Sequence, residues 1–439
     1  MSTKLPSCFD ITIERVVFEG DGMAHYAERP TVKARPVFVA GVFPGEHVRV
    51  TPVRVMSKFA KARLVQVLKS DPVRREPRDP SHLSTSPWQT VPESMQLSWK
   101  RDTALDMWRH TTGGIPADDV EIVTSPSAWE YRNKLEFSIV GETGKLVLAF
   151  RERGRWNAFV QCPTGTALAP RAMNVVAEAV VTELNRQNIP AHAIKGLLVR
   201  HAFATQQTIA VLFVKTHSIK PFTLPAGLTN GWRIAYSDPI RSENIETKIL
   251  HDEGTLELTE RIADVELTYG HHSFFQVNPP AFTKLIEFLQ KELQPEETLI
   301  DLYAGVGAIG LALHQQFQHL ISIESNHEAV SFARRNTATL KIQPEIIDGM
   351  VEKQALANML TRAETVIVDP PRAGLHADAV DQIMEALPAT LVYVSCNPAT
   401  QARDFTRLKE KYDVHAWKLF DFYPQTPHLE SVLVLKKRS

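Results

Sequence analysis

Cysteine, long apolar runs and net charge are all scarce in this chain of 439 residues, and each shortage excludes a class of protein. Three cysteines are too few for a disulfide scaffold and indicate a reducing compartment, so we expect a cytoplasmic protein. No apolar run approaches the roughly 18 residues that a membrane-spanning helix needs, and no signal-peptide pattern predicts export. With 49 basic and 50 acidic side chains, any case for binding nucleic acid must come from local charge.

The first region, residues 1–68, is typical of a small β module. Short segments of alternating apolar and polar residues are separated by turns such as EGDG and FPGE, and this spacing predicts a small barrel or sandwich. Between residues 49 and 75 the chain carries eight lysines and arginines against one acid, Asp71. This basic arm favours contact with nucleic acid, although charged side chains also protect an edge strand from aggregation.

Two further regions follow the basic arm. Residues 69–262 contain predicted helices over 95–110 and 172–187 among short strands, which predicts an α+β domain. The helix over 95–110 is also a candidate element of the third region, residues 263–439. In that region apolar strands alternate with helices, as in a doubly wound parallel sheet that is covered on both faces. We therefore expect a multidomain chain that ends in an α/β domain.

The strongest local motif is DLYAGVGAIG, from Asp301 to Gly310, which follows an expected strand and opens a helix. A glycine-rich turn lets backbone approach a ligand, and an acid about 20 residues on, here Glu324, is placed to bind ribose hydroxyls. The motif alone suits a dinucleotide or S-adenosylmethionine, and a tight turn without a ligand is the third possibility. The acid Asp301 at the strand end argues against a nearby pyrophosphate and favours a cationic sulfonium ligand.

Further acids and a cysteine follow other expected strands. Asp369 opens DPPRAG, where consecutive prolines hold its carboxylate at a rigid turn. Cys396 in SCNPAT stands just past a strand, at the edge where open α/β sheets bind ligands. A lone cysteine is usually buried and inert, but an edge shared with Tyr303, Glu324 and Asp369 favours a nucleophile. Glu430 in PQTPHLE precedes the last strand, from which a carboxylate can reach the same edge.

The adjacent pair His271–His272 is the one candidate for metal ligation that the sequence offers. Zinc in proteins takes three or four side-chain ligands, and two adjacent histidines supply at most two. Neither a carboxylate nor a third ligand stands at a suitable spacing in the sequence, so we expect no metal.

Together the motifs resemble those of the RNA 5-methyluridine methyltransferases, over nearly the whole chain. The stretches that carry the resemblance are, in order, FVAGVFPGEHV, YRNK, FFQVNP, DLYAGVG, DPPRAG, SCNPAT and PQTPHLE. The first stretch is similar to part of a TRAM domain, which is an OB-like RNA-binding barrel. The resemblance also implies that the C-terminal α/β domain is a class I methyltransferase domain. It implies four side chains that bind S-adenosylmethionine: Gln276, Tyr303, Glu324 and Asp369. It also implies Cys396 as the nucleophile and Glu430 as the base.

The sequence departs from many of these relatives in one respect. Those relatives carry three cysteines after the TRAM domain and a fourth in the central domain, and the four hold an iron–sulfur cluster. Here Asp79, Thr85 and Trp88 stand at the first three positions, and only Cys162 remains. One thiolate cannot hold such a cluster, so we expect none.

The resemblance predicts S-adenosylmethionine-dependent methylation of carbon 5 of a specific uridine in RNA, through a covalent bond from the cysteine to carbon 6 of the base. The TRAM-like region favours ribosomal RNA over the T loop of tRNA as the substrate. Three other interpretations stay open: a non-catalytic RNA-binding protein on the same fold, a nicotinamide-dependent oxidoreductase and a cytosine-5 methyltransferase. We expect RNA as the partner, no membrane contact and a monomer.

Overall fold

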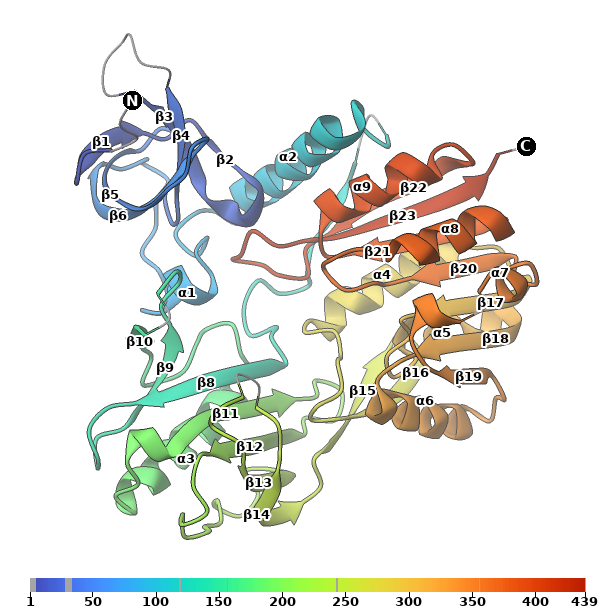
Figure 1. Ribbon diagram of the computed structural model, residues 1–439. Helices are drawn as coiled ribbons and strands as arrows, with labels where there is room; N and C mark the ends of the chain where they lie inside the picture. The colour runs from blue at the N-terminus through green and yellow to red at the C-terminus, as the bar shows by residue number, and fades with distance from the viewer. Residues whose placement is uncertain are drawn as a thin grey trace.

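Three large sheets and a two-stranded ribbon make up the described β-structure (Figure 1). The computed structural model describes residues 5–27, 34–117, 120–155, 157–241, 244–354 and 356–438. The N-terminal sheet, in blue, stands at the start of a long helix that runs to the C-terminal sheet, in red and orange, and the central sheet, in green, lies below (Figure 1). None of the described helices is long and apolar enough to cross a membrane.

The N-terminal sheet is built from short strands whose alternate side chains point into a small core. Its described strands are β1 (Phe9–Thr12), β2 (Arg15–Val16), β3 (Gly22–Tyr26), β4 (Arg35–Val39), β5 (His47–Val55) and β6 (Ala60–Lys69). Their order is β1-β5-β6-β4-β3-β2, with β4–β6 parallel and the other pairs antiparallel. Ile11, Val37 and Val48 lie in the core. Among the described residues no ladder joins the edge strands β1 and β2, so the closed barrel stays a prediction.

The basic arm lies on β5, β6 and the segment that follows them. Arg49 pairs with Asp10 on β1, its Nε 2.8 Å from Oδ1, and Arg74 pairs with the buried Glu46 at 2.7 Å. Four other basic side chains are exposed on the β5–β6 hairpin, and we call them the hairpin cluster: Arg54, Lys58, Lys61 and Arg63. Part of the basic arm therefore stabilises the fold, and the hairpin cluster is open to solvent.

The central sheet packs against one long helix, α3 (Arg171–Arg186), whose bounds lie within one residue of the predicted helix. Its described strands are β8 (Lys134–Val140), β9 (Val147–Arg151), β10 (Phe159–Gln161), β11 (Ile194–His201), β12 (Thr208–Val214), β13 (Gly231–Tyr236) and β14 (Lys248–Gly254). They pair in the order β10-β9-β8-β11-β12-β13-β14. Helix α3 buries Met173, Val176 and Val180 in the core that it shares with this sheet, as expected of an α+β domain.

The C-terminal sheet is mostly parallel. Its described strands are β7 (Ile122–Val123), β17 (Glu296–Leu302), β18 (Phe317–Glu324), β19 (Glu345–Asp348), β20 (Thr365–Val368), β21 (Thr390–Ser395), β22 (Tyr412–Phe420) and β23 (Glu430–Lys437). They pair in the order β19-β18-β17-β20-β21-β23-β22-β7. The first five run parallel to one another, and β23 is antiparallel to both of its neighbours.

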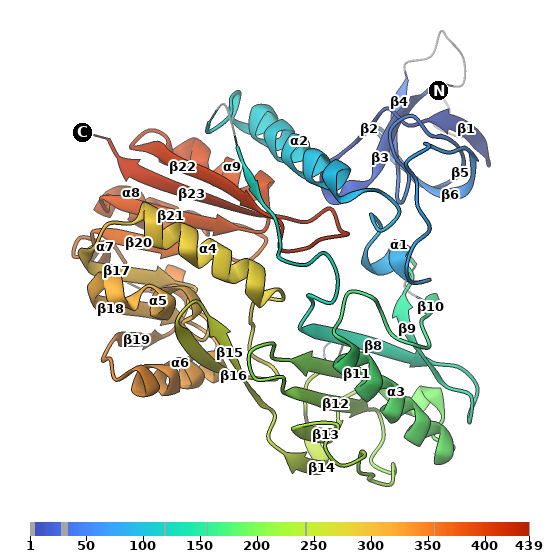
Figure 2. The ribbon, with the colours of Figure 1, turned by 180° about the vertical axis from the view of Figure 1, so that it is seen from behind.

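Helices cover both faces of the C-terminal sheet. On one face α4 (Pro279–Glu292), α5 (Ala308–Ala312) and α6 (His327–Leu340) share a core with the strands. On the other face the core includes side chains from α7 (Leu356–Leu360), α8 (Ala377–Ala386) and α9 (Pro398–Leu408). Helices α8 and α9 are in front of the sheet in Figure 1, and α4 is in front of it in Figure 2. This is the doubly wound arrangement that the sequence predicts.

The helix expected over 95–110 is α2 (Glu93–Thr112), and it packs on the C-terminal sheet. Its Trp108 contacts Phe405 of α9 and Trp417 of β22, with ring centroids 5.3 and 5.6 Å away. Strand β7 follows and pairs in parallel with β22. The chain therefore contributes a helix and an edge strand to the C-terminal layers before it forms the central sheet.

A two-stranded ribbon lies between the central and C-terminal sheets. It consists of β15 (Glu257–Ile262) and β16 (Val265–Gly270), which are antiparallel. Leu258 and Leu267 of the ribbon share one apolar core with Val211 of the central sheet and Phe282 of α4. Because one core spans the ribbon and both sheets, it fixes the course of the segment that follows Gly270.

Asp79, one of the three residues that the sequence resemblance sets at cluster positions, is the centre of a buried hydrogen-bond network. The residue is 8% exposed, and its carboxylate accepts four hydrogen bonds, at 2.8–3.2 Å, from Ser81 Oγ, Gln89 Nε2, Thr166 Oγ1 and the amide of Ala167. Cys162 is buried close by, and burial together with the charge of Asp79 raises the pKa of its thiol to about 12. The network joins the segment near α1 (His82–Thr85) to the central domain.

We expect Asp79→Ala to destabilise the protein by about 3 kcal/mol, because it leaves buried donors without an acceptor. Urea unfolding followed by tryptophan fluorescence measures the change. Asp413→Ala is the control, since Asp413 is 67% exposed and pairs only with Arg438 at the surface, where such a pair contributes at most about 1 kcal/mol. Equal effects of the two substitutions would show that the network around Asp79 does not stabilise the fold.

Candidate active site

The residues singled out in the sequence meet at the carboxyl edge of the C-terminal sheet. Parallel pairing aligns Leu302 with Ile323 and with Val368, and Val368 with Tyr393, so β17, β18, β20 and β21 all end on the same side. Glu324 is the last residue of β18, and Tyr303, Asp369 and Cys396 directly follow the ends of β17, β20 and β21. The structure therefore confirms the prediction that these strands end at one edge of the sheet.

The glycine-rich turn after β17 has a backbone that most side chains would not tolerate. Tyr303, Gly305 and Gly307 all have positive φ, of 64°, 58° and 87°. A Cβ placed on Gly305 would meet no atom within 4 Å, so the turn is open above this residue. Glu324 Oε2 accepts a hydrogen bond of 2.9 Å from the Gly305 amide, while Oε1 accepts from the amides of the two residues that follow Glu324. The carboxylate and the turn are thus held together.

Buried carboxylates beneath this turn give the edge a negative character. Asp301 is 1% exposed, and its Oδ2 accepts from the Gly310 amide at 2.9 Å while its Oδ1 has no partner. Burial is the main cause that raises the pKa of Asp301 to about 7. The charges of Asp369 and Glu324 also raise it, while the hydrogen bond from the Gly310 amide lowers it. Burial also raises the pKa of Asp369 to about 7. A cation placed among these groups would favour their charged forms.

Gln276 reaches the same pocket from the segment before α4. Gln276, Tyr303 and Asp369 line one narrow cavity, and Gln276 Nε2 lies 3.4 Å from Asp369 Oδ2. Asn133 of the YRNK motif holds this segment, because its Nδ2 donates to the Gln276 carbonyl at 2.9 Å and its amide donates to the Val277 carbonyl. The structure therefore brings together the four residues Gln276, Tyr303, Asp369 and, through the Gly305 amide, Glu324.

Cys396 and Glu430 are neighbours across two antiparallel strands. Ser395 at the end of β21 pairs with Ser431 of β23, so the next position along β21 faces Glu430. Burial raises the pKa of the Cys396 thiol to about 11, and the charge of Glu430 adds to this, while Arg372 opposes it with a positive charge and a hydrogen bond. Burial and Asp369 raise the pKa of Glu430 well above its usual range.

Tyr423 is a site residue that the sequence interpretation missed. Its hydroxyl donates a hydrogen bond of 3.0 Å to Glu430 Oε1, and burial together with Glu430 and Cys396 raises its own pKa. Tyr423 is anchored in turn, since its carbonyl accepts from the buried Lys100 of α2, which also pairs with Asp421. A phenol in the sequence DFYPQ gives no signal by itself, because its partner is set by the turn between β22 and β23.

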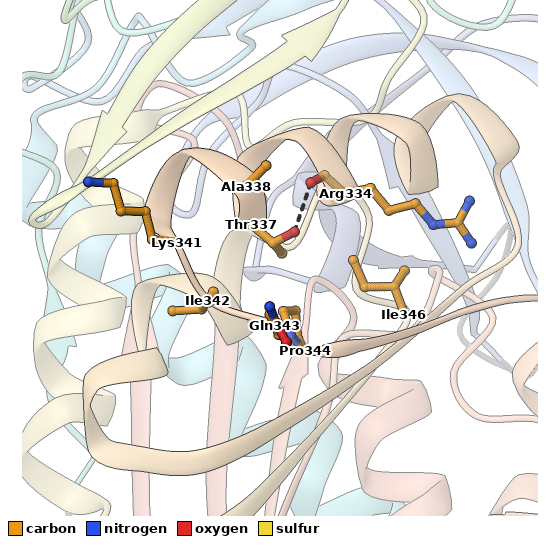
Figure 3. Close-up of a pocket in the computed structure, with 8 residues that line it drawn as sticks. All are labelled: Arg334, Thr337, Ala338, Lys341, Ile342, Gln343, Pro344 and Ile346. Carbon is orange, nitrogen blue, oxygen red and sulfur yellow. Dashed lines mark hydrogen bonds between the residues drawn. The ribbon is translucent and has the colours of Figure 1, made fainter.

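Two other features near the motifs do not belong to this chemistry. Burial, with nearby positive charges, lowers the pKa of His428 to about 4, so this ring is neutral. A hollow of about 570 Å³ beside α6 is lined by residues such as Arg334, Thr337 and Lys341 (Figure 3). No residue of the seven motif stretches lines it, so it is separate from the carboxyl edge.

Comparison with known proteins identifies the family of this site. The family model described as tRNA (uracil-5-)-methyltransferase matches residues 96–438, which is from α2 to the last strand. The chain belongs to this family. It is therefore an S-adenosylmethionine-dependent RNA methyltransferase. Of the two ligands that suit the glycine-rich turn, this assignment selects S-adenosylmethionine over a dinucleotide. It also excludes two interpretations of the sequence, a nicotinamide-dependent oxidoreductase and a non-catalytic RNA-binding protein.

Relatives and solved structures agree with this assignment. An RNA methyltransferase of Lactobacillus johnsonii is 31% identical over 97% of this chain and 96% of its own length. One of Nanoarchaeum equitans is 28% identical over 91% of this chain and 89% of its own length. Both relatives are described as uncharacterised. The crystal structure of a Pyrococcus abyssi tRNA (uracil-54, C5)-methyltransferase with S-adenosyl-L-homocysteine has the same fold. It matches with a TM-score of 0.75 at 24% identity, over 97% of this chain and all of the other.

The environments of the three cysteines predict distinct rates of alkylation. Cys8 is exposed, whereas the raised pKa values of Cys396 and Cys162 keep both as thiols near neutral pH. We expect iodoacetamide at pH 7.5 to modify Cys8 first, with the rate at Cys396 rising about tenfold for each pH unit up to pH 9. Mass spectrometry of digests measures both rates. Arg372→Gln should slow the alkylation of Cys396 further, because it removes the positive charge that stabilises the thiolate. Equal alkylation rates of Cys396 and Cys8 at pH 7.5 would contradict this description of the site.

Proposed function

We propose that the protein methylates carbon 5 of a uridine in RNA, with Cys396 as the nucleophile and Glu430 as the base. The observation that carries this proposal is the register of β21 and β23, which sets a thiol and a carboxylate side by side. Both groups lie close enough to Asp369, which lines the acidic pocket, for its charge to raise their pKa values. Uracil is a poor carbon nucleophile, and addition of a thiolate at carbon 6 converts it into an enolate that is a good one. A thiol, a base and a cofactor pocket at one edge are the groups that this reaction needs.

The pocket fits S-adenosylmethionine in charge and in shape. When bound, the cofactor supplies an electrophilic methyl group on a positively charged sulfur. The unpartnered Oδ1 of Asp301 and the carboxylate of Asp369 give the pocket a negative charge that suits a cation. Gly305 leaves open space above the turn, and Glu324 at the end of β18 is placed for ribose hydroxyls. We assign Gln276 and Tyr303 to the same cofactor because they line the same cavity.

The chain's own residues carry out the steps on the base. The Cys396 sulfur forms a bond to carbon 6, and the electron pair of the carbon 5–carbon 6 double bond moves onto the enolate. Carbon 5 then takes the methyl group and still bears its proton. Glu430 removes that proton, the double bond re-forms, and the carbon 6–sulfur bond breaks to release Cys396 as thiolate. Because the edge is buried in the fold, the target base must leave its stack to reach it.

Local charges prepare both groups for these roles. A carboxyl group whose pKa is raised is a stronger base once ionised, and burial raises the pKa of Glu430 in this way. The Tyr423 hydroxyl fixes Oε1 of Glu430 and leaves Oε2 for the proton. Arg372 stabilises the thiolate of Cys396. A cation seated at Asp369 would offset the negative charge that keeps this thiol protonated, so loading of the cofactor and activation of the thiol are coupled.

Ribosomal RNA is the substrate that we propose, on the basis of the N-terminal β domain. The hairpin cluster presents four exposed positive charges, which suit the phosphates of a large folded RNA. The T loop of tRNA is the second candidate, favoured by the name of the family whose model matches the chain. On either RNA we place the enzyme in the cytoplasm, because three cysteines suit a reducing compartment, and we propose that it acts as a monomer.

The charge of the pocket predicts a pH dependence of cofactor binding. Asp301 and Asp369 ionise as the pH rises through about 7, and only their ionised forms attract a sulfonium. We therefore expect the preference for S-adenosylmethionine over the neutral thioether S-adenosylhomocysteine to rise from pH 6 to pH 8, by up to about tenfold for one carboxylate. Calorimetric titration of both ligands measures the ratio of their dissociation constants. Both ligands carry the same amino and carboxyl groups, so pH effects on those groups cancel in this ratio. A ratio that does not change with pH would exclude these acids as partners of the sulfonium.

The assignment of Glu430 is tested by trapping the reaction. In Glu430→Gln, addition and methyl transfer can proceed, but the carbon 5 proton stays in place and Cys396 stays bound to the base. We expect a protein–RNA adduct that survives denaturing electrophoresis and carries label from the cofactor's methyl group. Sequencing the RNA recovered from this adduct, after incubation with total RNA, distinguishes ribosomal RNA from tRNA.

Two variants serve as controls for the trap. The double variant Cys396→Ala, Glu430→Gln should give no adduct. Tyr423→Phe keeps the ring and removes only the hydroxyl, so we expect turnover about tenfold slower with little stable adduct. Normal turnover by Glu430→Gln would show that another group removes the proton.

A further inference from the structure

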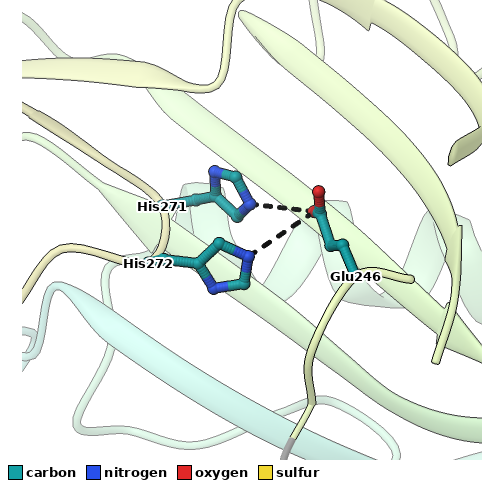
Figure 4. Close-up of side chains that lie close together, drawn as sticks. All are labelled: Glu246, His271 and His272. Atoms are coloured by element: carbon teal, nitrogen blue, oxygen red, sulfur yellow. Dashed lines mark hydrogen bonds and ion pairs between the residues drawn. The ribbon is translucent and has the colours of Figure 1, made fainter. Parts of the chain in front are cut away.

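Two histidines and a glutamate converge beside the junction of the central and C-terminal domains (Figure 4). His271 and His272 directly follow β16, and Glu246 lies on the connection between β13 and β14. One ligand atom from each side chain can be chosen so that all three lie within 4.8 Å of one another. The sequence alone gave the histidine pair no third ligand, because Glu246 is 25 positions upstream and reaches the pair only through the fold.

One carboxylate oxygen of Glu246 faces both histidine rings, and the other accepts a hydrogen bond from Arg233. Glu246 Oε1 lies 2.8 Å from Nε2 of His271 and 3.9 Å from Nε2 of His272. Its Oε2 accepts a hydrogen bond of 2.9 Å from Arg233, whose Nε and second terminal nitrogen are held by Asp252. A second oxygen fixed in this way is how outer-shell groups orient a carboxylate ligand.

The charges around the trio suit a cation. Three carboxylates, those of Glu246, Asp252 and Glu328, face two basic side chains, Arg233 and Lys134.

We propose that Glu246, His271 and His272 form a binding site for a divalent transition metal of the zinc class. Two imidazole nitrogens and one carboxylate oxygen are ligands that zinc takes in proteins, and they leave a fourth position for water. Bonds of about 2.0–2.1 Å place tetrahedral ligand atoms about 3.3 Å apart, so the His272 ring has to close by less than 1 Å on Glu246. Coordination through Nε2 of His271 moves the proton that it shares with Glu246 to Nδ1 or to solvent.

A metal at this position would act as a cross-link between domains. Glu246 belongs to the central sheet's connection, while His272 stands four residues before Gln276 of the cofactor pocket. His271 and Glu246 are also mostly buried, with side chains 11% and 13% exposed, whereas His272 is 37% exposed and gives an ion access. The bound ion would hold the segment that leads into the pocket. This inference does not depend on the reaction proposed above.

The test is metal binding by the full chain, first freed of metal with a chelator. We expect one Zn²⁺ or Co²⁺ per chain by calorimetry, and visible absorption bands of Co²⁺ in a four-coordinate nitrogen and oxygen environment. His272→Ala should weaken the affinity about tenfold or more while leaving the fold intact, because within the described part of the chain the polar contact of His272 with Glu246 is 3.9 Å long. Glu246→Gln should weaken it as well by removing the negative ligand.

A matched control distinguishes a three-ligand site from any histidine beside a carboxylate. His415 lies 3.5 Å from Glu292 with its side chain 47% exposed and has no second histidine at this contact, so His415→Ala should leave the affinity unchanged. The proposal is overturned if the wild-type chain binds neither ion, or if His272→Ala and His415→Ala behave alike. A thiolate-to-cobalt charge-transfer band would overturn it too, because it would place the metal on a cysteine.

Discussion

The repulsion among buried carboxylates at one sheet edge is the constraint on which the site depends. Asp301, Asp369 and Glu430 lose most of their hydration at this edge. In addition, Asp369 raises the pKa values of Asp301, Glu430 and Cys396, and Glu430 raises that of Cys396. Such a group costs free energy in the folded state as the pH rises through its raised pKa, so this edge is less stable when charged. A cation bound among these groups would relieve that cost, and the same negative charge raises the pKa of the Cys396 thiol. In the proposed mechanism, cofactor binding and activation of the thiol therefore depend on one electrostatic arrangement.

A second constraint is the buried junction that holds the central domain against this edge. Tyr131 donates its hydroxyl hydrogen to the Pro424 carbonyl, and Asn133 is hydrogen-bonded to the backbone of Gln276 and Val277. Tyr131 and Asn133 of the YRNK motif therefore connect the central domain to the turn that carries Tyr423 and to the segment that carries Gln276. The motif has no reactive group, and the structure gives it a role in alignment. Small displacements at such a junction would separate the thiol, the base and the cofactor pocket.

The loop around Asp79 shows how polar residues stabilise a junction. Asp79 accepts hydrogen bonds from its own loop and from the segment around Thr166, close to the buried Cys162. Its carboxylate links segments that are 87 positions apart. Hydrogen bonds among ordinary side chains therefore hold the loop that follows the N-terminal sheet against the central sheet's domain.

The sequence by itself determined which residues stand at the ends of the strands. Apolar strands alternating with helices require a doubly wound sheet, and in such a sheet Tyr303, Glu324, Asp369 and Cys396 must meet at one edge, because parallel strands all end on the same side. Contacts between distant segments were decided only by the tertiary structure. The β21–β23 register brings Glu430 to Cys396, a turn aims Tyr423 at Glu430, and the connection from β13 to β14 brings a carboxylate to the histidine pair. Local patterns fix local conformation, whereas these contacts depend on how separate elements pack, which no spacing in the sequence encodes.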